Sequence, residues 1–326
     1  MRRLKILDNL SWVTHYDTRY DSPINREDKE LIESFISKFC SAKGKNVLYR
    51  GTNKIFESHN IRLGDPILTL SERLFMIGNK SEYYTNEKNE SLNSTDRIIF
   101  EEIYRGLKDK LCAVNFTNSK TVGRVKQLIK ESPNFCTFFQ NPNNEECFID
   151  KINEQTEEIK RGIRDYYLAL FHTIGRSMVG NSSTVVSTSI NPCVAKKFQK
   201  EGIIIITWAL KKKSTPSHID INDLGIHKTI EKLGLPAVLS SPYPEQEEFC
   251  IKCGILPHFI LGYIWKDSKF VVNNYLLEQI REGYQMQDII RNGIQIDQHS
   301  FEEVLSQTSF KKYFSFIDGQ YFEFLR

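Results

Sequence analysis

The sequence has no long hydrophobic run, and no stretch approaches the ~18 consecutive apolar residues that a membrane-spanning helix needs. It also lacks an excess of charge of one sign, because 44 basic residues stand against 41 acidic residues and the net charge is +3. This balance neither requires nor excludes a nucleic-acid partner. The N-terminus begins with basic residues but has no sustained apolar segment, so we expect neither a secretory signal nor a membrane segment.

Cysteine is sparse and irregularly spaced, with seven residues in 326. An odd, scattered set is typical of reduced thiols rather than of a disulfide framework. Cys250 and Cys253 form one CxxC pair, but no second pair and no nearby pair of histidines completes a zinc-ligand set. We therefore expect a cytoplasmic protein that holds no metal ion.

Hydrophobic periodicity predicts an α+β chain, and the 40% of hydrophobic residues suffice for a sizeable core. Apolar side chains recur at helical spacing in residues 24–42, 97–111 and 154–175. Residues 132–149, with two prolines and several asparagines, are expected to be irregular. Strands are predicted at 46–51, 184–189, 203–210, 237–240, 258–265 and 269–272. Of these, residues 203–210 are apolar enough to be buried on both faces.

The first candidate binding residue lies at the end of the strand at 46–51, where Arg50 precedes Gly51. A guanidinium at such a turn is suited to hold a phosphate or a carboxylate through two parallel hydrogen bonds. Taken alone, an ordinary surface ion pair explains this arginine better.

A second polar motif ends the β-branched strand at 184–189 and consists of three hydroxyl side chains, Ser187, Thr188 and Ser189. Pro192 then opens a short helix, since proline is favoured in the first turn. The apolar residues of that helix are expected to face inward: Val194, Ala195 and Phe198.

The third motif is acidic, and residues 243–248 read Tyr-Pro-Glu-Gln-Glu-Glu before an apolar run. In an extended strand, Gln246 and Glu248 would share one face, and Glu245 and Glu247 would share the other. Neighbouring carboxylates repel one another in a purely structural strand, and each pair could instead present two polar side chains to one small ligand. Taken alone, a solvated edge strand explains an acidic run better.

In this order and with these flanks, the three motifs resemble the R-S-E class of the ADP-ribosyltransferase superfamily. The resemblance implies an α+β fold, a split β-sandwich of two mostly antiparallel sheets with N-terminal and inserted helices and a C-terminal extension. It covers residues 46–265 as a catalytic domain. Residues 1–45 would then be an N-terminal helical segment, and residues 266–326 an extension that packs on the domain or on a partner.

Two alignments of the acidic motif fit the family pattern. With Glu248 as the catalytic acid, Gln246 lies two residues before it and Tyr243 takes the aromatic position. Gly254 then falls at the glycine that usually follows the apolar run. With Glu247 as the catalytic acid, Glu248 would interrupt that run, so we favour Glu248.

The resemblance implies NAD as the co-substrate. The residues implied to bind it are Arg50, Gly51, Thr188, Ser189 and Tyr243, and those implied in catalysis are Ser187, Gln246 and Glu248. Arg50 would contact the pyrophosphate or its adjoining ribose, and Ser187 would support the nicotinamide ribose. Glu248 would bind the 2′-hydroxyl of that ribose and stabilise the oxocarbenium ion as nicotinamide leaves. Gln246 would orient the acceptor nucleophile.

The acceptor is expected to be a macromolecule. In the family, a glutamate at the position of Gln246 goes with arginine acceptors, so the resemblance implies another acceptor here. The many basic residues between 105 and 130 favour RNA or DNA over a protein side chain. The chain would then be a toxin or a phage-defence effector, and a toxin inside its own cell would need an antitoxin, for which the Phe-rich tail is a candidate surface. The alternatives are ADP-ribosylation of a protein side chain, NAD hydrolysis without transfer, and an inactive sensor or interaction module of the same fold.

Overall fold

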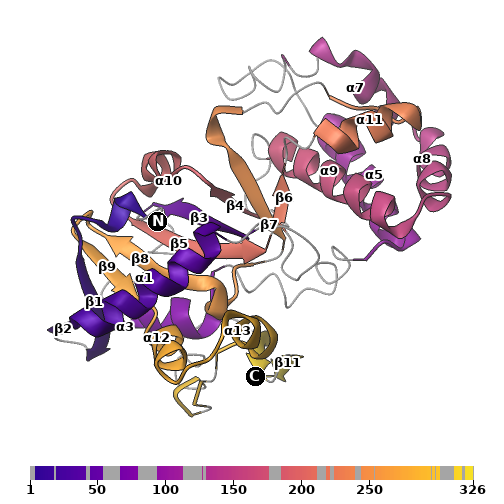
Figure 1. The fold of residues 1–326 in the computed structure, drawn as a ribbon. Coiled ribbons are helices and arrows are strands. Elements are labelled where there is room, and N and C mark those ends of the chain that lie inside the picture. Colours follow the sequence, from indigo (N-terminus) through magenta and orange to yellow (C-terminus); the bar gives the residue numbers. More distant parts are fainter. Residues whose placement is uncertain are drawn as a thin grey trace. The chain divides into compact units, whose positions relative to one another are not determined.

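The computed structural model describes residues 4–17, 20–41, 45–53, 67–79, 94–112, 127, 130–175, 185–210, 218–220, 224–238, 244–252, 254–294, 296–297, 299–301, 312–317 and 320–325. The chain divides into two compact units (Figure 1). We call residues 1–86, 186–218 and 253–326 the first unit, and residues 87–185 and 219–252 the second unit.

A mixed, mostly antiparallel sheet forms the centre of the first unit. Its strands lie in the order β2 (Tyr20–Pro23), β1 (Ser11–Asp17), β9 (Lys269–Val272), β8 (Ile260–Trp265), β5 (Ile203–Leu210), β3 (Lys45–Thr52) and β4 (Val185–Ser189). β1 and β9 run parallel, whereas β5 runs antiparallel to both β3 and β8. β1 and β9 are neighbours although they lie far apart in the sequence, so segments from both sides of the chain's middle complete the same sheet.

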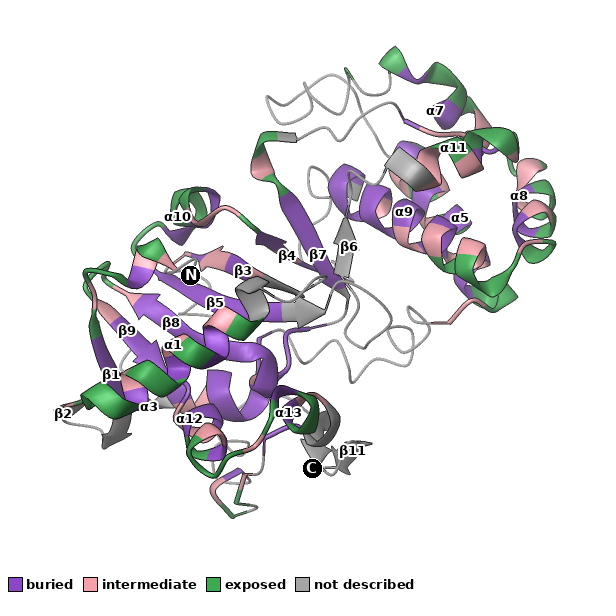
Figure 2. Ribbon diagram, in the orientation of Figure 1, coloured by how far each residue is buried: buried purple, intermediate pink, exposed green. Residues whose placement is uncertain are grey.

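β5 is the buried centre of this sheet. Residues 203–208 are all buried, which confirms that this apolar run is covered on both faces (Figure 2). Helix α1 (Arg26–Ser41), which the periodicity predicted, packs on β3, and its Phe35 ring meets Trp208 of β5 edge-on with centroids 6.4 Å apart. An isoleucine-rich strand needs this cover, since each buried apolar side chain contributes about 1.5–3 kcal/mol of transfer free energy.

Helix α10 (Pro192–Gln199) lies directly on β3, and Gly51 makes this close approach possible. A Cβ atom at position 51 would lie 1.9 Å from the carbonyl oxygen of Ala195, which is backbone that cannot move aside. The prediction that Phe198 faces inward is wrong, because its side chain is 45% exposed. Gln199 is buried in its place, and its amide donates to the carbonyl of Gly202 at 3.1 Å as the helix ends.

The remaining helices of the first unit are α3 (Ile67–Glu72), the π-helix η2 (Arg73–Ile77), α12 (Asn274–Arg281) and α13 (Met286–Asn292), with short 3-10 turns η1 (Lys5–Leu7) and η6 (Pro257–Phe259). α1 and α12 are joined by an ion pair in which Arg281 donates to the two carboxylate oxygens of Asp28 at 2.7 and 2.5 Å. The Phe-rich end of the chain forms a separate antiparallel hairpin, β10 (Lys312–Ile317) and β11 (Gln320–Leu325). Its use as a docking surface stays a prediction.

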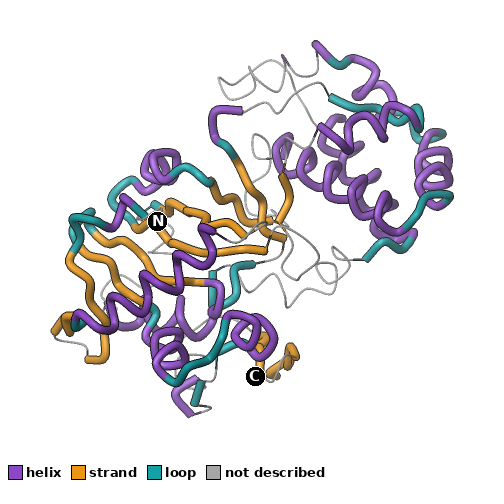
Figure 3. The backbone as a smooth tube through the Cα atoms, in the orientation of Figure 1, coloured by secondary structure: helices purple, strands orange, loops and turns teal. Residues whose placement is uncertain are grey.

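The second unit is mostly helical (Figure 3). Its helices are α5 (Arg97–Cys112), α7 (Pro133–Gln140), α8 (Asn144–Asn153), α9 (Glu157–Gly175) and α11 (Leu224–Lys232). The predictions of α5 and α9 from hydrophobic periodicity are confirmed. The rings of Phe139 and Phe148 lie 5.5 Å apart, and both also contact Tyr104 and Tyr167, so aromatic side chains from four helices form one buried cluster.

The prediction that residues 132–149 are irregular is wrong, because this segment forms α7 and α8. Pro133 occupies the first turn of α7, where a missing N–H leaves no hydrogen bond unmade. Pro142 lies in the turn between the helices. The prediction of a strand at 237–240 is also not met, since Ala237 and Val238 lie in a loop and the next two residues lie outside the described ranges.

The α+β class with mostly antiparallel strands is confirmed. In place of two packed sheets, the strands of the first unit form one main sheet and the separate β10–β11 hairpin. The first unit combines residues from all three predicted segments, 1–45, 46–265 and 266–326. The predicted catalytic domain and its two flanking segments stay a prediction. Among the described residues, no helix is both long enough and apolar enough to cross a membrane.

Candidate functional site

Arg50 and Ser187 meet within the first unit although 137 positions separate them. Arg50 lies on β3, and its Nη1 donates a hydrogen bond of 2.7 Å to the main-chain carbonyl oxygen of Ser187 on β4. The two strands run antiparallel, with Tyr49 opposite Ser189. Two of the three sequence motifs therefore lie on neighbouring, hydrogen-bonded strands.

The hydroxyl motif leads directly into helix α10. Ser187 is half-buried, whereas Thr188 and Ser189 are buried. The Oγ of Ser189 accepts a hydrogen bond of 3.0 Å from the amide of Asn191, and the side chain of Asn191 in turn caps the helix by accepting from the amide of Cys193 at 3.0 Å. Ser189 therefore has a structural task in this turn, and the side chain of Ser187 is the more accessible of the three.

The acidic motif does not form the strand that the sequence predicted. Residues Pro244–Gln246 form a 3-10 turn, η5, and Glu247 takes a left-handed backbone conformation with φ of 42°. Strand β7 (Glu248–Lys252) begins only at Glu248. The prediction that Gln246 shares a strand face with Glu248 is therefore wrong, because the alternation of faces applies only from Glu248 onward.

The turn separates the carboxylates of the motif by their exposure. Glu245 and Glu247 are exposed and Gln246 is half-buried, whereas Glu248 is only 6% exposed. A buried carboxylate at the start of a strand is costly to desolvate, so its presence indicates partners that stabilise it. Tyr243, the predicted aromatic marker of the motif, lies outside the described residues.

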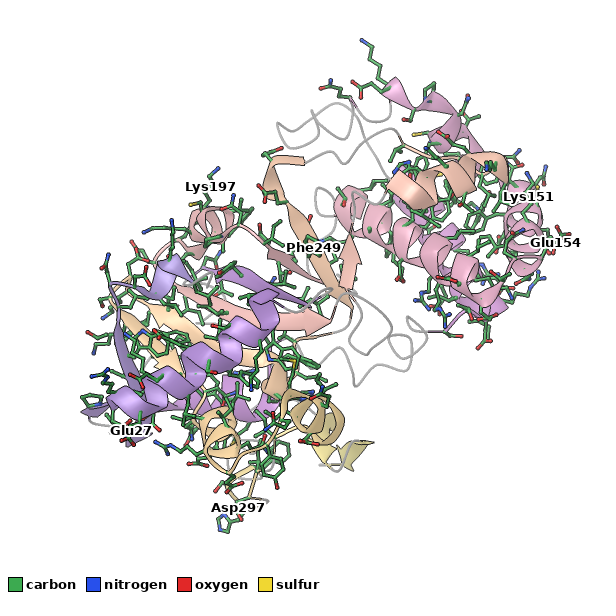
Figure 4. The ribbon with its side chains drawn as sticks, in the orientation of Figure 1. Glu27, Lys151, Glu154, Lys197, Phe249 and Asp297 are labelled. Atoms are coloured by element: carbon green, nitrogen blue, oxygen red, sulfur yellow. The ribbon has the colours of Figure 1, made fainter. Side chains whose placement is uncertain are left out.

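His172 lies beside Glu248. It lies in the last turn of α9, and its Nε2 is 3.4 Å from Oε1 of Glu248, with both side chains buried. Cys250 completes a triad, since the ligand atoms of His172, Glu248 and Cys250 all lie within 4.8 Å of one another. Glu248 and Cys250 share one face of β7, and Phe249 between them, labelled in Figure 4, takes the other face.

The sequence pattern does not connect His172 with Glu248. The residues 173–247 separate the two, and nothing in either local pattern indicates that they meet. The i, i+2 spacing of Glu248 and Cys250 was a usable signal, because it places both side chains on one face of a strand.

The basic stretch at 105–130 contributes less free charge than its sequence indicates. Arg105 donates to Glu145 at 2.9 Å and also lies 3.6 Å from Glu101. The ammonium group of Lys110 lies 3.7 Å from the centroid of the Phe171 ring, and burial lowers its pKa to about 8. Both side chains are thus engaged within the second unit, and most of residues 113–129 lie outside the described ranges.

Comparison of the chain with protein-family models, with curated proteins and with solved structures finds no match. The assignment of Arg50, Ser187 and Glu248 to one reaction therefore stays a prediction. It is supported by the order of the motifs and by the contacts of each residue within its own unit.

Proposed function

We propose that the chain is a mono-ADP-ribosyltransferase that cleaves NAD and transfers ADP-ribose to a macromolecular acceptor. The observation that carries the proposal is the hydrogen bond from Arg50 to the Ser187 carbonyl, because it brings two motifs of the R-S-E pattern together on paired strands. An ADP-ribosyltransferase-like arrangement of the catalytic part of the chain belongs to the same proposal.

Arg50 and Ser187 would bind the NAD molecule from β3 and β4. Arg50 presents a permanent positive charge and several N–H donors, which suit the pyrophosphate or its adjoining ribose. One of those donors fixes the side chain to the Ser187 carbonyl, so the remaining guanidinium is held in one orientation. Ser187 would support the nicotinamide ribose. Gly51 lets α10 pack closely on β3, because a Cβ atom at this position would meet the backbone of Ala195 and Gln199.

Glu248 would carry the chemical step. The bond between the ribose carbon and the nicotinamide nitrogen breaks, its electron pair stays on nicotinamide, and positive charge develops on the ribose. A carboxylate beside that charge stabilises the transition state most where water is excluded, and Glu248 is buried. The acceptor nucleophile then bonds to the ribose carbon and loses its proton.

The contrast between Glu248 and Glu247 supports Glu248 as the catalytic acid. Glu248 is buried beside His172, where a carboxylate is held by its neighbours, whereas Glu247 is exposed in a strained turn. Gln246, half-buried in η5, would orient the acceptor, and Tyr243 would help to place it.

We favour a nucleic-acid base as the acceptor and a role as a toxin or phage-defence effector with an antitoxin. Gln246 two positions before Glu248 supports a non-arginine acceptor, and the sequence between 113 and 130 is rich in basic residues that would suit a polyanion. A protein side chain as acceptor, NAD hydrolysis and an inactive interaction module remain the competing functions.

Incubation of the purified chain with a whole-cell lysate and NAD labelled in its ADP-ribose moiety tests the proposal. We expect a labelled polynucleotide that survives protease and is destroyed by nuclease, and we expect no label with the variant Glu248→Gln. Label that is lost to protease alone would assign a protein acceptor instead. Free labelled ADP-ribose without a labelled macromolecule would indicate hydrolysis, and an absence of nicotinamide release would favour the inactive module.

A further inference from the structure

The buried triad of His172, Glu248 and Cys250 combines three kinds of metal ligand: an imidazole nitrogen, a carboxylate oxygen and a thiol sulfur. All three lie in the second unit, His172 in the last turn of α9 and the other two on β7. Because Glu248 and Cys250 are two residues apart on a strand, their side chains leave the same face, and the helix end supplies the third group opposite them. The convergence of these three groups is not explained by apolar packing, which a valine or leucine would serve better.

The distances fit a small tetrahedral ion. Zinc binds nitrogen and oxygen ligands at about 2.0–2.2 Å and sulfur at about 2.3 Å, so neighbouring ligand atoms in a tetrahedron lie roughly 3.3–3.6 Å apart. The Nε2 of His172 and the Oε1 of Glu248 are 3.4 Å apart. The ligand atoms of the whole triad lie within 4.8 Å of one another, so small changes of side-chain torsion would bring all three to coordination distance.

The ligand types select the metal. Calcium and magnesium prefer sets made of oxygen atoms, and a thiol with an imidazole does not suit either. A mixed nitrogen, sulfur and oxygen set suits zinc, and cobalt(II) takes the same ligands and reports on them by its colour. Three protein ligands leave the fourth position open to water or a small ligand. Binding requires the Cys250 thiolate, so a proton is released and the affinity rises with pH.

We propose that His172, Glu248 and Cys250 bind one Zn²⁺ ion, and that the bound ion inhibits ADP-ribosyl transfer by occupying the Glu248 carboxylate. The inhibition, though not the binding, rests on the function proposed above. A carboxylate coordinated to zinc shares a lone pair with the metal, and the charge of the ion offsets its own, so it no longer serves the 2′-hydroxyl or the oxocarbenium ion. The ion is thus an inhibitor of the reaction and not its cofactor.

Cobalt(II) and zinc titrations of the chelator-treated full chain test the binding. We expect one ion per chain, thiolate-to-cobalt charge-transfer absorption, and bleaching of that absorption when zinc displaces cobalt. Cys250→Ser should abolish the charge-transfer absorption and weaken zinc binding at least about 100-fold, as measured by competition with a chromophoric chelator. Cys147→Ser provides the matched control, because Cys147 is an exposed free thiol on α8 and should leave both signals unchanged.

Circular dichroism, and thermal melting with and without zinc, distinguish a variant that has lost a metal ligand from one that is misfolded. Zinc should raise the midpoint of the wild-type chain and of Cys147→Ser, because it binds only the folded state, and should not raise that of His172→Asn or Cys250→Ser. A wild-type chain that binds no cobalt, or a Cys250→Ser variant that binds zinc as tightly as the wild type, would overturn the metal site.

Nicotinamide release from NAD, measured for each protein with and without saturating zinc, tests the inhibition. Zinc should lower the rate at least 10-fold for the wild type and for Cys147→Ser. For Cys250→Ser, the rates with and without zinc should be nearly equal, whatever the basal rate of that variant. An active wild-type chain that binds zinc without losing activity would overturn the inhibition. A metal-free chain that binds zinc but never releases nicotinamide would leave the metal site standing and contradict the proposed transferase.

Discussion

The two units hold their candidate functional residues by different means. In the first unit, Arg50 and Ser187 lie on paired strands, and the register of the backbone ladder together with one side-chain hydrogen bond fixes them. In the second unit, Glu248 and His172 are held by burial, at the start of a strand and at the end of a helix. A motif on paired strands is therefore positioned by the backbone register, whereas a motif at the ends of elements is positioned by the packing of the surrounding side chains.

This contrast explains where each unit is sensitive to substitution. Backbone contact leaves no space to adjust, so a single added carbon atom at Gly51 meets a carbonyl oxygen that cannot move aside. Side-chain packing adjusts to added atoms more easily but loses stability when a large buried ring is removed. The first unit should therefore suffer most from small-to-large changes, and the second unit from large-to-small changes.

The largest expected effect is that of Phe139→Ala in the second unit. Phe139 is fully buried and its ring contacts those of Tyr104, Phe148 and Tyr167, so its removal leaves a cavity in the aromatic cluster. We expect a loss of about 4 kcal/mol in the free energy of unfolding, measured by urea denaturation. Hydrogen exchange should also rise along α5, α7, α8 and α9.

The matched control for this prediction is Phe198→Ala, because that phenylalanine is 45% exposed on α10. It should cost no more than about 1 kcal/mol. Equal losses from Phe139→Ala and Phe198→Ala would contradict the view that the aromatic cluster holds the second unit together.

A somewhat smaller effect is expected from Gly51→Ala in the first unit. The added Cβ would lie 1.9 Å from the Ala195 carbonyl oxygen, so α10 must move away from β3 at a cost of about 3 kcal/mol. Gly162→Ala in helix α9 makes the informative comparison, since its Cβ would meet only the flexible side chain of Ile226, with Cδ1 at 2.7 Å and Cγ1 at 3.4 Å. There the gain in helix propensity offsets the contact, and the change should stay within about 1 kcal/mol. A harmless Gly51→Ala would show that backbone contact does not hold the first motif.

The smallest expected effect concerns the ion pair between α1 and α12. The guanidinium of Arg281 lowers the pKa of the buried Asp28 carboxylate through hydrogen bonds, against the opposing effect of burial. Because Arg281 is 42% exposed and screened by solvent, we expect Asp28→Asn to cost about 1 kcal/mol at pH 7. Glu146→Gln, which breaks a surface pair with Arg97 in the second unit, should have no measurable effect.

The pH dependence of this difference follows from the direction of the pKa shift. A lowered pKa in the folded state means that the unfolded chain binds more protons, so the contribution of Asp28 is present above its ordinary pKa of 3.8. It is lost as the pH falls further, through the lowered pKa of the folded state. Urea titrations of the wild type and Asp28→Asn should therefore converge below about pH 4. A difference that persists unchanged at pH 2 would rule out an ionic origin.

Much of the fold could be predicted because its elements bury one face or both. The stripes of α1, α5 and α9 and the continuous isoleucine run of β5 are local patterns, and each is confirmed. The prediction for residues 132–149 was wrong because prolines and asparagines are common both in loops and at the starts of helices. The feature that favours helices here is the packing of Phe139 and Phe148 in the aromatic cluster, which the local sequence does not show. The exposure of Phe198 depends on where α10 ends, which the buried Gln199 decides.

The candidate site could be predicted as a set of motifs but not as an arrangement. The order of Arg50, Ser187 and Glu248 is visible in the sequence, and the contact of the first two follows from the pairing of β3 with β4. The turn at Glu247 was missed because glutamate rarely takes a positive φ, so nothing in the sequence indicates that the backbone turns there. His172 was missed because a contact between a helix end and a distant strand leaves no local pattern.

The rate of nicotinamide release from NAD by Glu248→Gln and Glu247→Gln, each compared with the wild type, decides whether Glu248 is the catalytic acid. If the buried carboxylate stabilises the developing positive charge, Glu248→Gln should lower the rate on the order of 10²-fold or more. Glu247→Gln, which changes an exposed side chain in the preceding turn, should keep the rate within about twofold of the wild type. Full activity in Glu248→Gln together with its loss in Glu247→Gln would contradict the account.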